Sequence, residues 1–286
     1  MIAGSQKRGM VARIQITIMR TAPPAIQLQN AEMMPRTSTK ARPSYLKQCA
    51  AHGCAIYHGL RLSLRAALEG SAVDHASERK KLGDLCRWYI SLLASWGLLE
   101  AEFSGFEESS KWRGSIIAAN HPSLFDAILM VSILPDVRCI MNSRLLRDPV
   151  MSGAPKLCGY IRNDTRFSMV RDSCRTLSSG ENLLVFPEGT RSTGNPIGPF
   201  RHGYALAATR CSAPIRTVLI ECDSDYLGRG FSFFYPTEEC PIRFRVTAGP
   251  IFRAEENEDP KALSARVEKY FTDTLKREDK VLRRIS

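Results

Sequence analysis

The chain has 286 residues, of which 44% are hydrophobic and 24% charged, as in a folded globular protein with a substantial core. Its 40 Lys+Arg against 29 Asp+Glu give a net charge of +11, which favours anionic partners such as phosphorylated molecules, anionic lipid or nucleic acid. The nine cysteines form no C-x-x-C pair, so we expect reduced thiols and no metal site. No stretch approaches the ~18 uninterrupted apolar residues of a membrane-spanning helix.

Residues 1–47 differ in composition from the rest, since they are rich in Arg, Lys, Met, Thr and Pro and hold no acidic residue before Glu32. We interpret them as a disordered basic extension, with an organelle transit peptide as the alternative. Residues 48–100 are expected to form amphipathic helices, one from about His58 and one over residues 77–99. The second joins basic residues to an apolar stripe, which suits either membrane contact or packing on the chain's own domain.

Residues 101–286 alternate between strand-like and helix-like patterns, which is typical of a layered α/β domain. We therefore predict an α/β fold with a central mostly parallel or mixed sheet flanked by helices and preceded by the N-terminal amphipathic helical region. The predicted strands are residues 103–106, 114–119, 137–141, 182–186, 214–221, 231–235 and 242–246. The predicted helices are residues 124–134, 165–178, 203–211 and 260–282, with a less regular one between 143 and 157.

The first motif is the stretch from Asn120 to Asp126, which reads N-H-P-S-L-F-D and follows an apolar predicted strand. A histidine can take a proton from a hydroxyl at neutral pH when a carboxylate holds its ring in the correct orientation. Ser123 can cap the following helix, which places Asp126 in the first turn, within reach of His121. The alternative is a capping box in which the aspartate only satisfies backbone donors.

The second motif, residues 186–192, reads F-P-E-G-T-R-S and directly follows the apolar strand N-L-L-V-F. Its proline cannot continue a strand ladder, and Gly189 permits a turn that other residues resist. Glu188, Thr190 and Arg191 would then project from the strand end, where ligands bind in α/β sheets. Arginine offers a planar fork suited to phosphate, although an ordinary surface loop with a Glu–Arg pair is the alternative.

Together the two motifs resemble those of the glycerolipid and lysophospholipid acyltransferase family, whose hallmarks are N-H-x4-D and F-P-E-G-T-R-S. The resemblance extends over about residues 115–223. It implies that the histidine acts as base on a glycerol hydroxyl that attacks an acyl thioester, that the aspartate orients the histidine, and that E-G-T-R binds the acceptor phosphate. A compressed version of the intermediate family block, Gly159–Asp164, implies a further phosphate contact. The implied catalytic residues are His121 and Asp126, and the implied substrate-binding residues are Glu188, Gly189, Thr190, Arg191 and Arg162.

The resemblance implies transfer of a fatty acyl group from acyl-CoA or acyl-carrier protein to a lysophospholipid, by default 1-acylglycerol-3-phosphate to give phosphatidate. Glycerol-3-phosphate or another lysolipid is the alternative acceptor. A non-catalytic lipid- or nucleic-acid-binding protein is a more remote alternative. We see no helix-turn-helix, zinc-finger or aromatic RNA-binding signature, so no nucleic acid partner is expected. No cofactor or metal beyond the co-substrate is expected, and the predicted location is cytoplasmic and peripheral to a membrane.

Overall fold

The structure is a computed structural model that describes residues 44–69, 73–192, 196–224, 228 and 239–285. The predicted extension over residues 1–47 therefore lies outside the described residues except at its end, where the first helix already begins at Tyr45. The predicted strand over residues 231–235 also lies outside them. The elements in chain order are α1 (Tyr45–Glu69), α2 (His75–Ser95), β1 (Leu99–Ser104), η1 (Ser109–Lys111), β2 (Ile116–Ala119), α3 (Phe125–Ile133), β3 (Val137–Met141), η2 (Ser143–Arg147), α4 (Gly153–Cys158), β4 (Ile161–Arg162), α5 (Arg166–Ser178), β5 (Asn182–Val185), α6 (Gly203–Cys211), β6 (Ile215–Cys222), β7 (Ile242–Phe252) and α7 (Pro260–Ile285).

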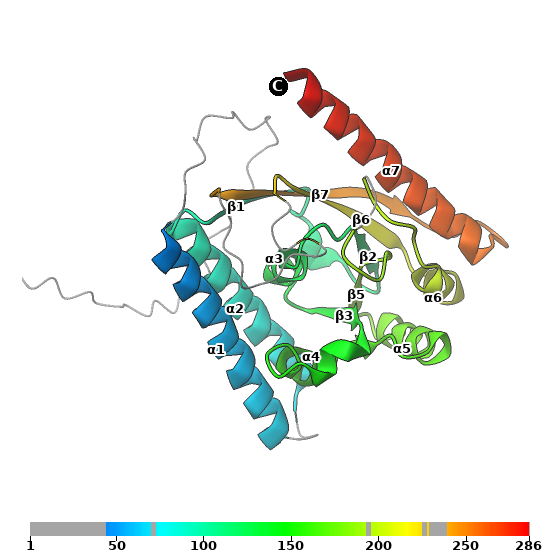
Figure 1. Cartoon of the computed structure of the whole chain (residues 1–286). Helices are drawn as coiled ribbons and strands as arrows, with labels where there is room; N and C mark the ends of the chain where they lie inside the picture. Colours follow the sequence, from blue (N-terminus) through cyan, green and yellow to red (C-terminus); the bar gives the residue numbers. More distant parts are fainter. Residues whose placement is uncertain (1–43, 70–72, 193–195, 225–227, 229–238, 286) are drawn as a thin grey trace, which may run out of the picture.

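A seven-stranded sheet in the order β1-β7-β6-β2-β5-β3-β4 forms the centre of the molecule (Figure 1). Strands β6, β2, β5, β3 and β4 all run parallel, whereas β6 pairs with β7 antiparallel and β1 follows the direction of β7. The predicted mostly parallel or mixed sheet is thus confirmed. Because the parallel strands point the same way, the loops that follow β2 and β5 emerge side by side at one edge of the sheet.

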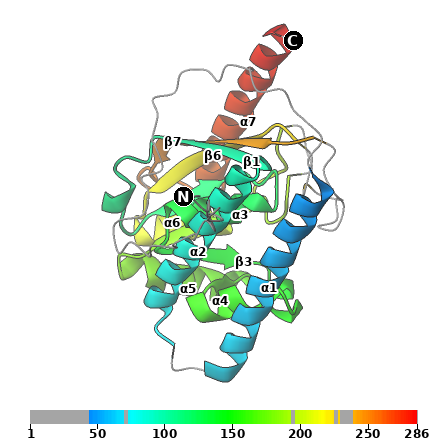
Figure 2. The ribbon, with the colours of Figure 1, turned by 90° about the vertical axis from the view of Figure 1, so that its left-hand side faces the viewer.

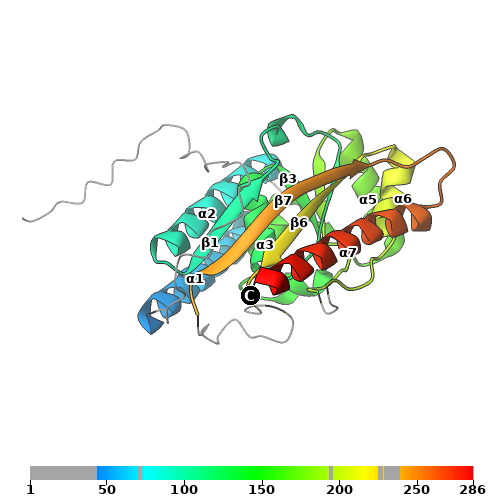
Figure 3. The same ribbon diagram turned by 90° about the horizontal axis from the view of Figure 1, so that it is seen from above.

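Helices cover both faces of the sheet, with α1, α2 and α3 on one side and α5, α6 and α7 on the other (Figures 1 and 3). The central strand β2 shows why both faces are needed, because all four of its residues are buried. Ile117 and Ala119 belong to the core under α2 and α3, while Ile116 and Ala118 belong to the core under α5, α6 and α7. Alternate strand residues point to opposite faces, so an entirely apolar strand is buried between two helical layers.

The N-terminal helices differ in how they are packed. On α2, Tyr89 and Leu93 are buried in the core and only Trp88 of its apolar stripe is an exposed large side chain, so this helix packs on its own domain. Helix α1 lies outside it and against α4 (Figure 2), held to α2 by the Tyr89 hydroxyl, which donates to Ala51 O at 3.2 Å. Of the two alternatives for the second helix, packing on its own domain accounts for these buried side chains, while contact of α2 with a membrane stays a prediction.

An exposed apolar stripe is present instead on α1, the 25-residue first helix. Its members recur at spacings that place them on one helical face, and each is between 46% and 79% exposed: Leu46, Tyr57, Leu60, Leu64 and Leu68. None of the helices in the described ranges combines the length and the apolar content needed to cross a bilayer.

Four of the nine cysteines are buried and behave as small apolar side chains: Cys86, Cys139, Cys158 and Cys240. All nine are free thiols. Burial raises the pKa of the Cys86 thiol and of the Cys139 thiol to about 12, so these thiols stay protonated and unreactive at neutral pH.

Candidate active site

His121 and Asp126 form a hydrogen-bonded pair at the end of the central strand β2. His121 Nδ1 lies 2.8 Å from Asp126 Oδ2, and the imidazole stacks on the Phe186 ring with centroids 4.1 Å apart. The aspartate is fully buried and 15% of the histidine side chain is exposed. With the carboxylate accepting from Nδ1–H, the other ring nitrogen carries the lone pair that a general base needs.

The aspartate also fills the capping role that was the alternative interpretation. Asp126 Oδ2 accepts a hydrogen bond from Ser123 N at 2.8 Å, and Ser123 Oγ accepts one from Phe125 N at 3.3 Å. The same carboxylate oxygen therefore fixes the first turn of α3 and the histidine ring. The two interpretations of the sequence describe one arrangement.

Burial shifts the proton affinity of this carboxyl. Removal from water raises the pKa of Asp126 from its ordinary 3.8 to about 6, and the hydrogen bond from His121 opposes this rise only in part. The carboxyl is consequently mostly ionised at neutral pH, which lies only a little above its pKa. Perturbed pairs of this kind are common where a proton is moved.

Asn120 anchors the motif to the neighbouring strand. Its side chain is buried; Nδ2 donates to Ile220 O and Oδ1 accepts from Ile220 N, each at 2.8 Å. The amide thus continues the β6 ladder where β2 has ended. This fixes the backbone on which His121 stands, a role that the sequence analysis did not assign.

Glu188 joins the second motif to the first. Its buried carboxylate accepts from His121 N at 3.2 Å and from Ser192 Oγ at 2.7 Å through Oε1, and from Gly198 N at 2.8 Å through Oε2. Ser192 N also donates to His121 O at 2.7 Å. Both carboxylate oxygens are used within the chain, so we expect Glu188 to order the loops rather than to touch an anionic substrate.

Gly189 occupies a tight turn with φ of 70°, closed by a 2.9 Å hydrogen bond from its N–H to Phe186 O. A Cβ at this position would lie 2.7 Å from Arg201 Nε, a contact that the flexible arginine side chain can relieve by moving, so it is the backbone angle that requires glycine. Arg201 precedes α6, and its N–H donates to Pro187 O at 2.8 Å. An arginine side chain that the sequence analysis left without a role therefore lies directly on the second motif.

The two arginines at this turn differ in their contacts. Arg191 Nη1 donates to Gly228 O at 2.8 Å, so part of its guanidinium is engaged by the chain. Arg201 is exposed and makes no ion pair within the described part of the chain. Thr190 is exposed between them. The turn therefore presents an exposed hydroxyl and guanidinium groups close to the His121 loop.

Arg162 is the one predicted site residue that lies apart from this cluster. It ends β4, which is separated from β2 by β5 and β3, a distance of roughly 14 Å at about 4.8 Å per strand spacing. Its guanidinium pairs with Asp164 at 3.2 Å. It lies at the same carboxyl edge of the sheet as His121, and its contact with a substrate phosphate stays a prediction.

Residues 100–221 match the protein family described as Acyltransferase. This chain carries an acyltransferase-family domain. That domain runs from β1 to β6 and includes every predicted site residue together with Asn120 and Arg201.

Two proteins that are similar in sequence to this chain have the same enzyme name. The chain is 25% identical over 138 residues to 1-acyl-sn-glycerol-3-phosphate acyltransferase alpha of Mus musculus, covering 45% of this chain and 47% of that protein. It is 23% identical over 212 residues to the 1-acyl-sn-glycerol-3-phosphate acyltransferase of Pseudomonas aeruginosa, covering 70% and 79%. The chain thus spans about half the length of the mouse relative.

The fold of the acyltransferase domain and its flanking helices is also known. The crystal structure of the 1-acyl-sn-glycerophosphate (LPA) acyltransferase PlsC from Thermotoga maritima superposes with a TM-score of 0.63 at 18% identity. The match covers 82% of this chain and 95% of that one. At this identity the likeness shows that the two share a fold.

Proposed function

We propose that this protein is an O-acyltransferase that moves a fatty acyl group from an acyl thioester to the hydroxyl of a lysophospholipid, with 1-acylglycerol-3-phosphate as the acceptor and phosphatidate as the product. The observation that carries the proposal is the 2.8 Å His121–Asp126 pair beside the turn that holds Gly189. The names of the relatives support the acceptor.

In the proposed reaction the histidine acts first as a base and then as an acid. The ring nitrogen of His121 opposite Asp126 takes the proton of the acceptor hydroxyl as its oxygen attacks the thioester carbonyl. The ionised aspartate stabilises the resulting imidazolium. Collapse of the tetrahedral intermediate breaks the carbon–sulfur bond, and the leaving thiolate takes the proton from the imidazolium. The thiol and the new ester are released, so atoms and charge balance without a metal or other cofactor, whose expected absence stays a prediction.

The acceptor phosphate is assigned to the turn at Gly189. Arg201 and Arg191 supply guanidinium forks there, and charge-assisted bonds from arginine to phosphate are among the stronger polar contacts. Thr190 adds an exposed hydroxyl. Binding the phosphate at this turn would place the glycerol hydroxyl toward His121, because Glu188 holds the two loops together.

The test is a product analysis. Purified protein would be incubated with acyl-CoA and, separately, lysophosphatidate, glycerol-3-phosphate and a neutral lysolipid, and the lipids identified by mass spectrometry. Phosphatidate formed by the wild type and by His52→Ala, but not by His121→Ala of unchanged circular dichroism, is the expected result. Exclusive acylation of a different acceptor would replace lysophosphatidate, and undiminished turnover by His121→Ala would remove the mechanism.

We also propose that the exposed stripe on α1 attaches the protein peripherally to a membrane. The stripe offers leucines at 46–79% exposure on a chain of net charge +11, and apolar burial combined with cationic charge is how interfacial helices bind anionic lipid. Co-sedimentation with vesicles containing an anionic lipid should be lost in Leu60→Asp/Leu64→Asp and retained in Ala262→Asp, which adds a charge on α7. Equal sedimentation of both variants would contradict the assignment.

A further inference from the structure

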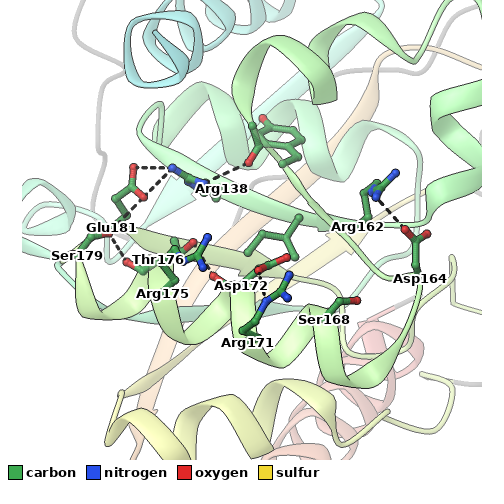
Figure 4. A pocket seen from close by; sticks show the side chains of 13 residues that line it. Arg138, Arg162, Asp164, Ser168, Arg171, Asp172, Arg175, Thr176, Ser179 and Glu181 are labelled. Carbon is green, nitrogen blue, oxygen red and sulfur yellow. Dashed lines mark hydrogen bonds and ion pairs between the residues drawn. The ribbon is translucent and has the colours of Figure 1, made fainter. Parts of the chain in front are cut away.

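A groove of about 760 Å³ lies outside the site described above, along the free edge of the sheet between β4 and α5 (Figure 4). None of its lining residues comes from the NHPSLFD or FPEGTRS stretches, and Arg162 is the one predicted site residue among them. Arg162 and Ser168 lie at the end where β4 finishes and α5 begins, and Arg138 and Glu181 lie at the opposite end. The groove therefore runs from the edge that carries the active site along the side of the domain.

Arginine dominates the charge of this groove. Its lining includes Arg138, Arg162, Arg171 and Arg175. Three of them have a carboxylate partner within the groove: Arg138 with Glu181 at 3.0 Å, Arg162 with Asp164 at 3.2 Å, and Arg171 with Asp172 at 2.9 Å. The pairs of Arg162 and Arg171 are exposed and contribute little to stability, so these two guanidinium groups can turn to a ligand at small cost. The Arg138–Glu181 pair is half-buried, and Glu181 also pairs with the buried Arg79.

Arg175 stands out among them. It is exposed, lies one helical turn beyond Arg171 on α5, and makes no ion pair in the part of the chain that the structure describes. Residues four apart on a helix lie on the same face. Arg171 and Arg175 thus form a neighbouring pair of guanidinium groups over one wall of the groove, suited to a phosphate or diphosphate group.

The remaining lining mixes polar side chains, which supply donors and acceptors, with the less polar Gly159, Tyr160 and Ile161. Ser168, Thr176 and Ser179 contribute hydroxyls, and the three carboxylates can accept hydrogen bonds. A ligand with phosphates, sugar hydroxyls and an exocyclic amine could use all of these groups. A lining with seven charged side chains suits such a polar ligand better than an acyl chain, because covering charged groups with apolar groups costs free energy. The volume lies within the range of small-molecule sites.

We propose that this groove binds the nucleotide end of a coenzyme A thioester, the acyl donor. The inference rests on the proposed acyl transfer and identifies coenzyme A, rather than a carrier protein, as the donor's carrier. Phosphates lie on Arg171 and Arg175, and the pantetheine arm leaves at Arg162. From there it crosses the ends of β3 and β5 to His121, roughly 14 Å away at about 4.8 Å per strand spacing. An extended arm of linked amide units spans such a distance.

The experiment separates donor binding from turnover. Binding of coenzyme A itself would be measured by titration calorimetry on His121→Ala protein, with and without Arg171→Ala/Arg175→Ala. Losing one exposed charge-assisted contact weakens binding by roughly tenfold, so the double substitution should raise the Kd by at least about tenfold. Arg210→Ala, which removes an exposed arginine from α6, should leave the Kd unchanged. In catalytically intact protein, the double variant should raise the KM for acyl-CoA but not for acyl-pantetheine, which lacks the nucleotide.

Each outcome bears on a different claim. An unchanged Kd for coenzyme A in the double variant overturns the groove assignment, while phosphatidate formation by the same variant keeps the acyltransferase assignment intact. Groove-dependent binding in a protein that transfers no acyl group supports the nucleotide site and overturns the proposed reaction instead. If the double variant lost transfer from acyl-carrier protein while binding coenzyme A normally, the arginines would serve a protein carrier and the nucleotide proposal would be wrong.

Discussion

Replacing Asp126 by asparagine removes a buried charge while nearly preserving the shape of the side chain. The carboxylate has no exposed surface, and its Oδ2 accepts hydrogen bonds from His121 Nδ1 and Ser123 N. An amide oxygen can still accept from Ser123, so the first turn of α3 should form. The substitution therefore tests the charge rather than the cap.

The raised pKa of the Asp126 carboxyl sets the size of the expected change in the free energy of unfolding with pH. Because burial raises the pKa of Asp126 from 3.8 to about 6, the folded state binds the proton more tightly than the unfolded state. The contribution of Asp126 to the free energy of unfolding of the wild type must then fall as the pH rises from about 4 to about 6, and level off above. A shift of about two pKa units corresponds to about 3 kcal/mol. Asp126→Asn carries no such group, so this pH dependence should be missing.

The measurement is chemical denaturation of both proteins at pH 4, 5, 6, 7 and 8. The difference in free energy of unfolding, wild type minus Asp126→Asn, should fall by about 2–3 kcal/mol between pH 4 and pH 8, with most of the change between pH 4 and pH 6. Titrating groups that do not interact with Asp126 cancel in this difference, whereas His121 and Glu188, which act on its carboxyl, do not. A constant offset is expected in addition, because Asp126 Oδ1 is buried without a hydrogen-bond partner and an amide nitrogen there would be an unpaired donor.

Activity should move in the opposite direction. The kcat/KM of the wild type should decline as the pH drops through about 6, when protonation of Asp126 removes the acceptor that orients His121. Asp126→Asn should lose a large part of the general-base contribution, about 10²–10⁴ in rate, at every pH. A stability difference that rises with pH would show that the fold favours the ionised carboxylate, and the reasoning from burial would be refuted.

Further substitutions test the other parts of the site. His121→Ala should lower kcat by about 10²–10⁴ while its circular dichroism spectrum stays that of the folded protein. Its melting temperature should fall, because the buried Asp126 carboxylate loses a hydrogen-bond partner. Arg201→Ala should raise the KM for lysophosphatidate by about tenfold, the effect of losing a charge-assisted bond, and leave the KM for the thioester unaltered. A larger effect of Arg191→Ala than of Arg201→Ala would show that Arg191 is the main phosphate contact. Glu188→Gln places an amide donor against backbone donors, so it should lower the free energy of unfolding by about 1–3 kcal/mol together with kcat. Normal stability in that variant would contradict the loop-joining role.

Local patterns predicted much of the fold. The helix expected over residues 203–211 and the strand expected over residues 137–141 match α6 and β3 at both ends. In each segment the spacing of the apolar residues fits only one type of secondary structure. The edge strand β4 was missed, since Ile161–Arg162 is too short to show any period. The first helix was placed from His58 instead of Tyr45, because Ala50 and Gly53 interrupt its apolar stripe.

The site was predicted where its contacts are close in sequence. His121 and Asp126 are five residues apart, and a strand followed by a helix brings them together without help from the rest of the chain. The contacts of Glu188 with His121 and of Asn120 with Ile220 join residues 67 and 100 positions apart. Such contacts depend on the order of strands in the sheet, which the pattern of one strand does not reveal. Arg201 was left unassigned for the same reason.

The apolar stripe on α1 also has a consequence for handling the purified protein. A 25-residue helix is about 38 Å long, and in lipid-free buffer its leucines remain in contact with water. Two copies can remove that surface from water by packing their first helices together, since large exposed apolar patches drive association. Elution volumes and scattering masses measured without lipid or detergent will therefore report self-association through this helix, and Leu60→Asp/Leu64→Asp should elute as the smaller particle.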